Sequence, residues 1–125
     1  MATVLCTKGK EMIASRVADL LSVPRYLAVG VGPGTSDPGD TTLFGETGAR
    51  MICALSLVTT DTVNDTLRCV ATWTNFGAIL TLTNTGIFDA ASSGNLLCKA
   101  DGVGQVLDTN EGLEITWDIK ITGQC

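Results

Sequence analysis

The five cysteines are the side chains of this sequence with the widest chemistry, because a thiol can bind a metal, form a disulfide or act as a nucleophile. No two of them lie closer than 16 positions, so neither zinc-ribbon nor redox-pair spacing occurs. The chain contains no histidine, which removes the usual partner of a catalytic cysteine or serine. Three cysteines lie within apolar stretches, where a free cysteine packs as a small apolar side chain: Cys53, Cys69 and Cys98.

The other two cysteines, Cys6 and Cys125, lie near the ends of the sequence, which are usually mobile and exposed. An odd number of cysteines favours at least one that is unpaired or bonded to another molecule. We therefore predict an intermolecular disulfide at Cys125, with Cys6 of a neighbouring copy as its candidate partner. This bond would form after assembly, in an oxidising medium.

A glycine- and proline-rich loop over residues 30–42 is the next candidate site. It does not fit a dinucleotide fingerprint, because Thr35 stands where the third glycine is needed, and it lacks the Gly-Lys-Ser/Thr of a Walker loop. The spacing of an EF-hand calcium loop is also missing around residues 37–40. Two interpretations remain, a flexible loop and an arm ordered by a neighbouring subunit. The candidate contact residues are Gly32, Pro33, Gly34, Thr35, Asp37 and Pro38.

The rest of the sequence contains no motif that indicates a catalytic site. The Gly-x-Ser-x-Gly of a hydrolase is absent, and the acidic residues fall mainly in turns or on the outer face of one strand. Glu46 and Arg50 are four positions apart and would pair on a short helical turn, which we predict within residues 43–50. We predict no catalytic residue, no cofactor and no metal.

One amphipathic helix is predicted at residues 8–22, with Thr7 as its cap and Pro24 beyond its end. Its apolar face would cover the sheet or contact a neighbouring subunit. The residues of that face are Met12, Ile13, Val17, Leu20 and Leu21.

The rest of the chain has the alternation and turn chemistry of β-strands. Strands are predicted at residues 26–31, 51–59, 66–74, 78–83, 96–98, 103–107 and 113–122, with turns at 60–65, 84–86 and 108–112. The stretch 51–59 is apolar on both faces, which is typical of a strand buried on two sides. We expect one mainly β domain over residues 1–125, an antiparallel β-sandwich or barrel built from 26–31 and 51–122.

Composition narrows the classes of partner. The net charge is −5 and no basic face is evident, so we expect no nucleic acid. No apolar run reaches the roughly 18 residues of a membrane span, and the N-terminal residues 1–15 contain no continuous apolar stretch of signal-peptide length. We therefore expect no membrane contact and synthesis in a cytoplasm.

The order of these parts carries a resemblance. Tyr-Leu-Ala-Val-Gly-Val-Gly at 26–32 precedes the loop, Thr-x-Leu-x-x-Glu-x-x-x-Arg follows at 41–50, and Leu-x-Ile-x-Trp-x-Ile stands at 113–119. With Gly-Ile-Phe-Asp-Ala at 86–90, this resembles small structural proteins of the virion modules of tailed bacteriophages. The resemblance implies a β-rich virion component, made in the host bacterial cytoplasm, that assembles and does not catalyse.

Three hypotheses follow. The first is a capsid decoration, or cement, protein that binds copies of itself, as a trimer, and the major capsid protein or another virion protein. The second is a tail, baseplate or fibre component, including a receptor-binding tip. The third is a carbohydrate- or ligand-binding module or an enzyme, for which the chain offers only six aromatic residues. Copy number per particle separates the first two.

Overall fold

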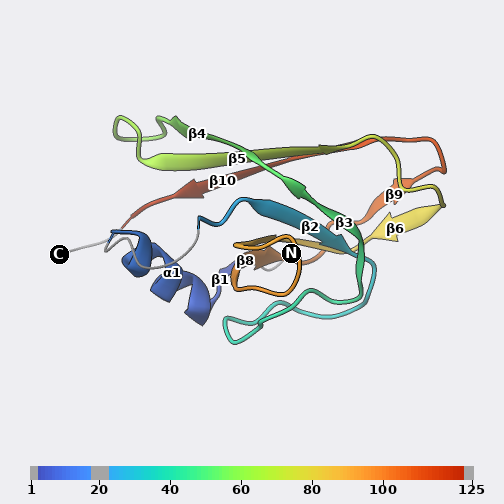
Figure 1. The fold of residues 1–125 in the computed structure, drawn as a ribbon, viewed down its shortest axis with the longest axis horizontal. Helices are drawn as coiled ribbons and strands as arrows, with labels where there is room; N and C mark the ends of the chain where they lie inside the picture. Colours follow the sequence, from blue (N-terminus) through green and yellow to red (C-terminus); the bar gives the residue numbers. More distant parts are fainter. Residues whose placement is uncertain (1–2, 18–22, 123–125) are drawn as a thin grey trace.

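The computed structural model describes residues 3–17 and 23–122. Their order along the chain begins with a short strand and one helix, and continues with strands only (Figure 1). The elements are β1 (Thr3–Leu5), α1 (Thr7–Val17), β2 (Tyr26–Gly30), β3 (Glu46–Ile52), β4 (Ala54–Val58), β5 (Thr66–Trp73), β6 (Leu80–Leu82), β7 (Asn84–Phe88), β8 (Leu96–Ala100), β9 (Gln105–Leu107) and β10 (Leu113–Lys120).

The strands form two antiparallel sheets and a two-stranded ribbon. The larger sheet has the order β1-β8-β7-β2-β3, the smaller has the order β10-β5-β4, and β6 pairs with β9. In Figure 1 the smaller sheet lies above the larger one, and the ribbon lies at the end away from α1. The chain is mainly β and antiparallel, as predicted; over the described residues neither sheet closes on itself.

The main core lies between the two sheets. Trp73 and Trp117 of the smaller sheet pack there with Leu27, Ile87 and Leu97 of the larger one. This is the face that the alternation in β5 and β10 predicts, because every second residue of a strand points the same way. The registers confirm it, since Trp117 lies opposite Cys69 and Leu113 opposite Trp73.

A second core lies on the other face of the larger sheet. Leu43 covers Phe88 and Leu96 from the loop between β2 and β3. Because this sheet is covered on both faces, every residue of β7 and β8 is buried. The predicted turn at 84–86 is therefore wrong: these residues begin β7, and Gly86 is needed because a side chain there would meet Leu43 and the Cys98 carbonyl.

The N-terminal helix is confirmed, and α1 packs on β8. Gly9 makes the approach close, since a Cβ there would lie 2.1 Å from the Leu97 carbonyl oxygen. Met12 is buried and Ile13 partly buried, as predicted. Leu20 and Leu21 lie outside the described residues, as does the predicted end of the helix.

Two predictions for residues 43–59 are corrected. Residues 46–52 form strand β3 and not a helical turn, and the two-sided burial expected for 51–59 is wrong. The chain passes here from the larger sheet, where β3 pairs with β2, to the smaller, where β4 pairs with β5. Both strands lie at sheet edges, which leaves Ile52 59% and Leu57 60% exposed. In the described ranges no helix has the length and apolarity to cross a membrane.

Candidate functional site: the loop between β2 and β3

The candidate contact loop, predicted at residues 30–42, spans residues 31–45 and runs without helix or strand between two neighbouring strands of the larger sheet. Pro33, Gly34, Thr35, Asp37 and Pro38 are exposed, and Gly32 is partly buried. In Figure 1 the loop passes below the larger sheet, on the side away from the smaller one. The structure thus places the six predicted contact residues on one continuous segment.

Lys99 is the main anchor of this loop. It lies in β8 with 1% of its side chain exposed, and its Nζ donates to Asp40 Oδ2 and to the Thr42 carbonyl, each at 2.9 Å. The ammonium also lies 3.2 Å from the centre of the Phe44 ring. A buried charge is costly unless it is paired and hydrogen-bonded. All three partners of Lys99 come from the loop, so the position of the loop satisfies this buried charge.

Further hydrogen bonds fix both arms of the loop. The Asn84 side chain brackets Phe44, accepting from its N–H at 3.1 Å and donating to its carbonyl at 2.9 Å. Thr83 Oγ1 donates to the Gly32 carbonyl at 2.6 Å. The N–H of Ser36 donates to Asp101 Oδ2. In addition, the N–H of Thr7, at the start of α1, donates to the Pro38 carbonyl at 2.7 Å.

Two aspartates of the loop accept hydrogen bonds from backbone N–H groups within the same turn. Asp37 Oδ1 accepts from the N–H of Gly39 at 2.8 Å, and Asp40 Oδ2 accepts from the N–H of Asp37 at 3.0 Å. Burial alone would raise the pKa of Asp40, but the hydrogen bonds and positive charge of Lys99, with the N–H of Asp37, hold it below its usual value. Across the described part of the chain no group of three or more cysteine or acidic side chains is placed to hold a metal ion.

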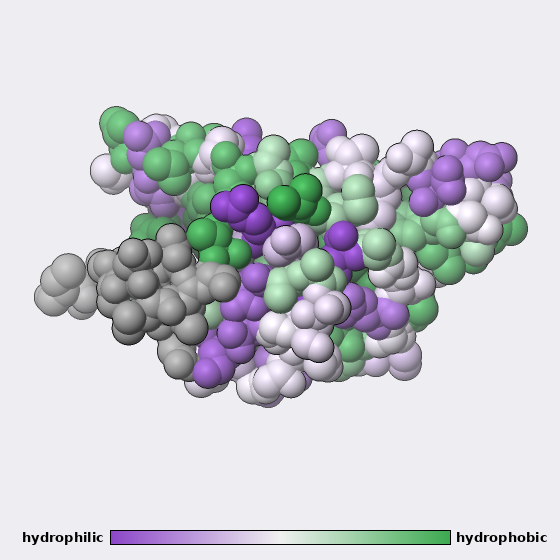
Figure 2. Space-filling view, viewed as in Figure 1, coloured by the Kyte–Doolittle hydropathy of each residue, from purple (hydrophilic) through white to green (hydrophobic). Residues whose placement is uncertain are grey.

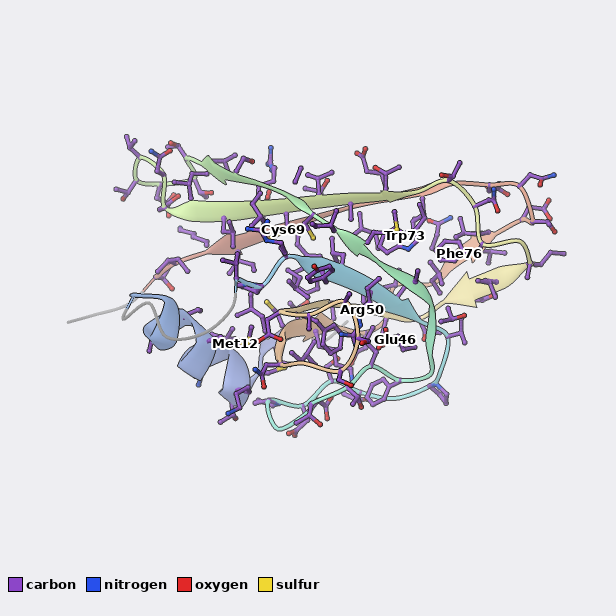
Figure 3. All side chains as sticks on the ribbon, in the orientation of Figure 1. Met12, Glu46, Arg50, Cys69, Trp73 and Phe76 are labelled. Atoms are coloured by element: carbon purple, nitrogen blue, oxygen red, sulfur yellow. The ribbon has the colours of Figure 1, made fainter. Side chains whose placement is uncertain are left out.

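The predicted Glu46–Arg50 pair forms, but on a strand. Arg50 Nε lies 2.8 Å from Glu46 Oε2 (Figure 3). A β-bulge makes this possible: Met51 pairs with Leu27 and Thr47 with Val29, so three residues of β3 stand opposite Ala28 alone. Sequence reasoning missed the other contacts of Arg50, whose guanidinium lies 3.5 Å from the Phe88 ring centre and donates to the carbonyls of Ala90 and Ser93.

The cysteines do not form a reactive site among the described residues. Cys6, Cys53, Cys69 and Cys98 are free and buried. Burial raises the pKa of Cys53 to about 11 and that of Cys69 to about 12, and it raises the pKa of Cys6 and Cys98 as well. These thiols therefore stay protonated and unreactive at neutral pH. The burial of the internal three agrees with their prediction as apolar packing residues.

Cys6 departs from the expectation of an exposed chain end, because it is fully buried at the start of α1. Its neighbours there include Phe88 and Leu96. Cys125 lies outside the described residues. The Cys6–Cys125 disulfide between copies stays a prediction, and its formation would require Cys6 to leave this apolar cluster.

Apolar side chains are also exposed away from the loop. Val63 is 76% exposed in the turn between β4 and β5, and Ile79 is 69% exposed before β6. Figure 2 shows hydrophobic residues on the surface at the end of the smaller sheet, where β4 and β5 meet. Scattered exposed apolar residues are normal, but in this chain they accompany a low charged fraction of 17%.

Comparison with known proteins finds no family model and no curated protein that matches this chain. In the described residues, an exposed loop is held in place on a framework of β-strands, and the four described cysteines are buried in its interior.

Proposed function

We propose that this chain is a non-enzymatic structural protein of a tailed-phage virion, and that it decorates the capsid. In this role it stabilises the shell by binding copies of itself and the major capsid protein or another virion protein. The two sheets act as a β-sandwich scaffold. The resemblance to small virion proteins and the absence of histidine from the sequence support a role in assembly.

The observation that carries the proposal is the fixation of the exposed loop. The loop is held by hydrogen bonds from the side chains of Lys99, Asn84 and Thr83, while Thr35 and Pro38 stay exposed. A loop that is already ordered loses less conformational entropy when it binds. This suits a surface that must dock in many identical copies.

Copy number in purified virions tests the location. Quantitative mass spectrometry against the major capsid protein should find hundreds of copies per particle. A few dozen copies or fewer would place the chain in the tail, baseplate or fibre and contradict the capsid role. Its absence from finished particles would overturn the virion proposal.

A loop variant tests the docking surface. Thr35→Glu should weaken binding to shells that lack the protein, because it adds charge and bulk to the exposed part of the loop. Ala54→Glu, on the exposed face of β4 opposite the uncharged Val70, is the control and should bind normally. Both variants should keep the unfolding midpoint of the parent, because neither site is buried. Equal binding by the two variants would contradict a role for the loop.

A further inference from the structure

Strand β10 lies at an open edge of the smaller sheet. In the part of the chain that the structure describes, it pairs only with β5, in unbroken register from Leu113 opposite Trp73 to Lys120 opposite Thr66. An edge strand exposes a row of backbone N–H and C=O groups that can pair with another chain. Proteins usually block such edges with proline, bulges, inward charges or charged side chains such as lysine. β10 has no proline, no bulge and no inward charge, and its charged residues, Glu114, Asp118 and Lys120, stand on the exposed face.

The sequence of β10 is self-complementary about Trp117. In an antiparallel pair of two copies with Trp117 opposite Trp117, each Ile115 faces Ile119 of the other copy, and each Leu113 faces Ile121. On the exposed face, Glu114 of one copy faces Lys120 of the other, twice by symmetry. Opposite charges directly across two strands are stabilising, so this register gains two ion pairs.

Neighbouring registers are unfavourable. In the register centred on Thr116, Glu114 of each copy lies opposite Asp118 of the other. In the register centred on Asp118, the two Asp118 side chains lie opposite each other. Like charges directly opposite each other are destabilising. Because one face is apolar and the other polar, only registers that keep the faces matched are allowed. Among these three registers the charges therefore favour the one centred on Trp117.

The space beside β10 also suits a further strand. A groove of about 480 Å³ runs between β10, β1 and α1, and its apolar walls include Val4, Leu5, Ile13, Trp117, Ile119 and Ile121. Ile121, just beyond β10, is 56% exposed. In the register centred on Trp117, Leu113 and Ile115 of a second copy lie opposite Ile121 and Ile119. They would cover this groove and remove its apolar walls from water.

We propose that two copies of this chain associate about a two-fold axis through their β10 edges, with Trp117 opposite Trp117 and reciprocal Glu114–Lys120 ion pairs. The two smaller sheets become one continuous six-stranded sheet, and the same patch is used on both copies, as a two-fold interface requires. This inference does not depend on the virion role, because it needs only the isolated chain.

Charge reversal tests the interface. The purified protein should dimerise in sedimentation equilibrium, and Glu114→Lys should weaken the dimer at least about tenfold, because two attractive pairs become two repulsive ones. Lys120 also contacts Asp61 within its own chain, so reversal at position 120 is made together with Asp61→Asn. The combination E114K/K120E/D61N should restore the dimer, while D61N alone should leave it at least as strong as in the parent, because Lys120 is then free to pair with Glu114 of the other copy.

The control and the contradicting outcomes are defined in the same assay. Ala54→Lys places a positive charge on the exposed face of β4, at the other edge of the smaller sheet and opposite the uncharged Val70, and should leave the dimer constant unchanged. Hydrogen exchange of residues 113–121 should slow as concentration rises through the dimer constant. A monomer at all concentrations, a dimer insensitive to E114K, or failure of the charge swap to restore it would overturn the proposal.

Discussion

At the scale of single residues, Lys99 is the side chain on which the loop depends most. Its ammonium is almost fully buried and is satisfied by Asp40, the Thr42 carbonyl and the Phe44 ring. A lysine in a short strand of leucines and a cysteine gives no sign in the sequence that it will be buried. Asp40 and Thr42 lie 59 and 57 positions earlier in the sequence, so only the fold shows that they are its partners.

Replacement of Lys99 by methionine should destabilise the protein by about 3 kcal/mol, because Asp40 and the Thr42 carbonyl lose their partner while the apolar stem is kept. Urea unfolding measures the change. Lys10→Met, at an exposed position of α1, is the control and should alter stability by less than about 0.5 kcal/mol. A K99M variant as stable as the parent would show that the loop is held without the ammonium.

The same contact predicts a pH dependence. Because the folded pKa of Asp40 lies below its unfolded value, its stabilising contribution is complete above the ordinary aspartate pKa of about 3.9. It is lost as the pH falls through the lowered folded value. The free energy of unfolding of Asp40→Asn should therefore lie below that of the parent at neutral pH and converge with it in acid. Parallel curves down to acid pH would contradict this assignment.

At the scale of elements, the bulge in β3 is the feature that sequence reasoning could not supply. The Thr-x-Leu-x-x-Glu-x-x-x-Arg stretch has the spacing of a helical pair, and the pair does form. The bulge at Gly48, with φ +70°, brings Glu46 and Arg50 together on a strand instead. It also leaves the Ala49 carbonyl to accept from Trp73 Nε1 at 3.0 Å.

Gly48→Ala should destabilise by about 1–3 kcal/mol, since φ is positive and the added Cβ would lie 3.1 Å from the Phe76 ring. Phe76 itself stacks on Trp73 with ring centres 5.9 Å apart, so a shift of Phe76 away from the added Cβ would disturb this contact (Figure 3). Gly77→Ala is the matched control, because Gly77 has the same φ of +70° and no atom within 4 Å of the added Cβ. The excess loss in G48A, measured by thermal unfolding, reports the contact with Phe76; equal losses would contradict it.

The elements with a strong hydrophobic periodicity were predicted from the sequence, whereas the elements that depend on tertiary contacts were not. The alternation in β5 and β10 and the helical spacing around Met12 and Ile13 correctly identified their elements. Asn84 and Gly86 have turn chemistry, yet they lie in the buried strand β7 because Phe44 needs the amide and Leu43 needs the space above the glycine. The composition of the sequence located the loop, but it did not predict the residues that hold the loop in place, Lys99, Asn84 and Thr83.

At the scale of the whole molecule, stability should be uneven. The strands β7 and β8 are buried on both faces, while β4 lies at an edge and β6 and β9 form a separate two-stranded ribbon. Hydrogen exchange should therefore be slowest in β7 and β8, approaching the rate set by global unfolding, and faster in β4, β6 and β9. Similar protection of the ribbon and β7 would contradict this division.

The Lys99–Asp40 contact has a consequence for biosynthesis. Asp40 leaves the ribosome well before Lys99, so the loop has no anchor until most of the chain has been translated. Long-range contacts of this kind form late and slow folding. In a nascent chain the Gly/Pro segment therefore lacks this anchor, and the loop takes its final position only after translation has passed β8.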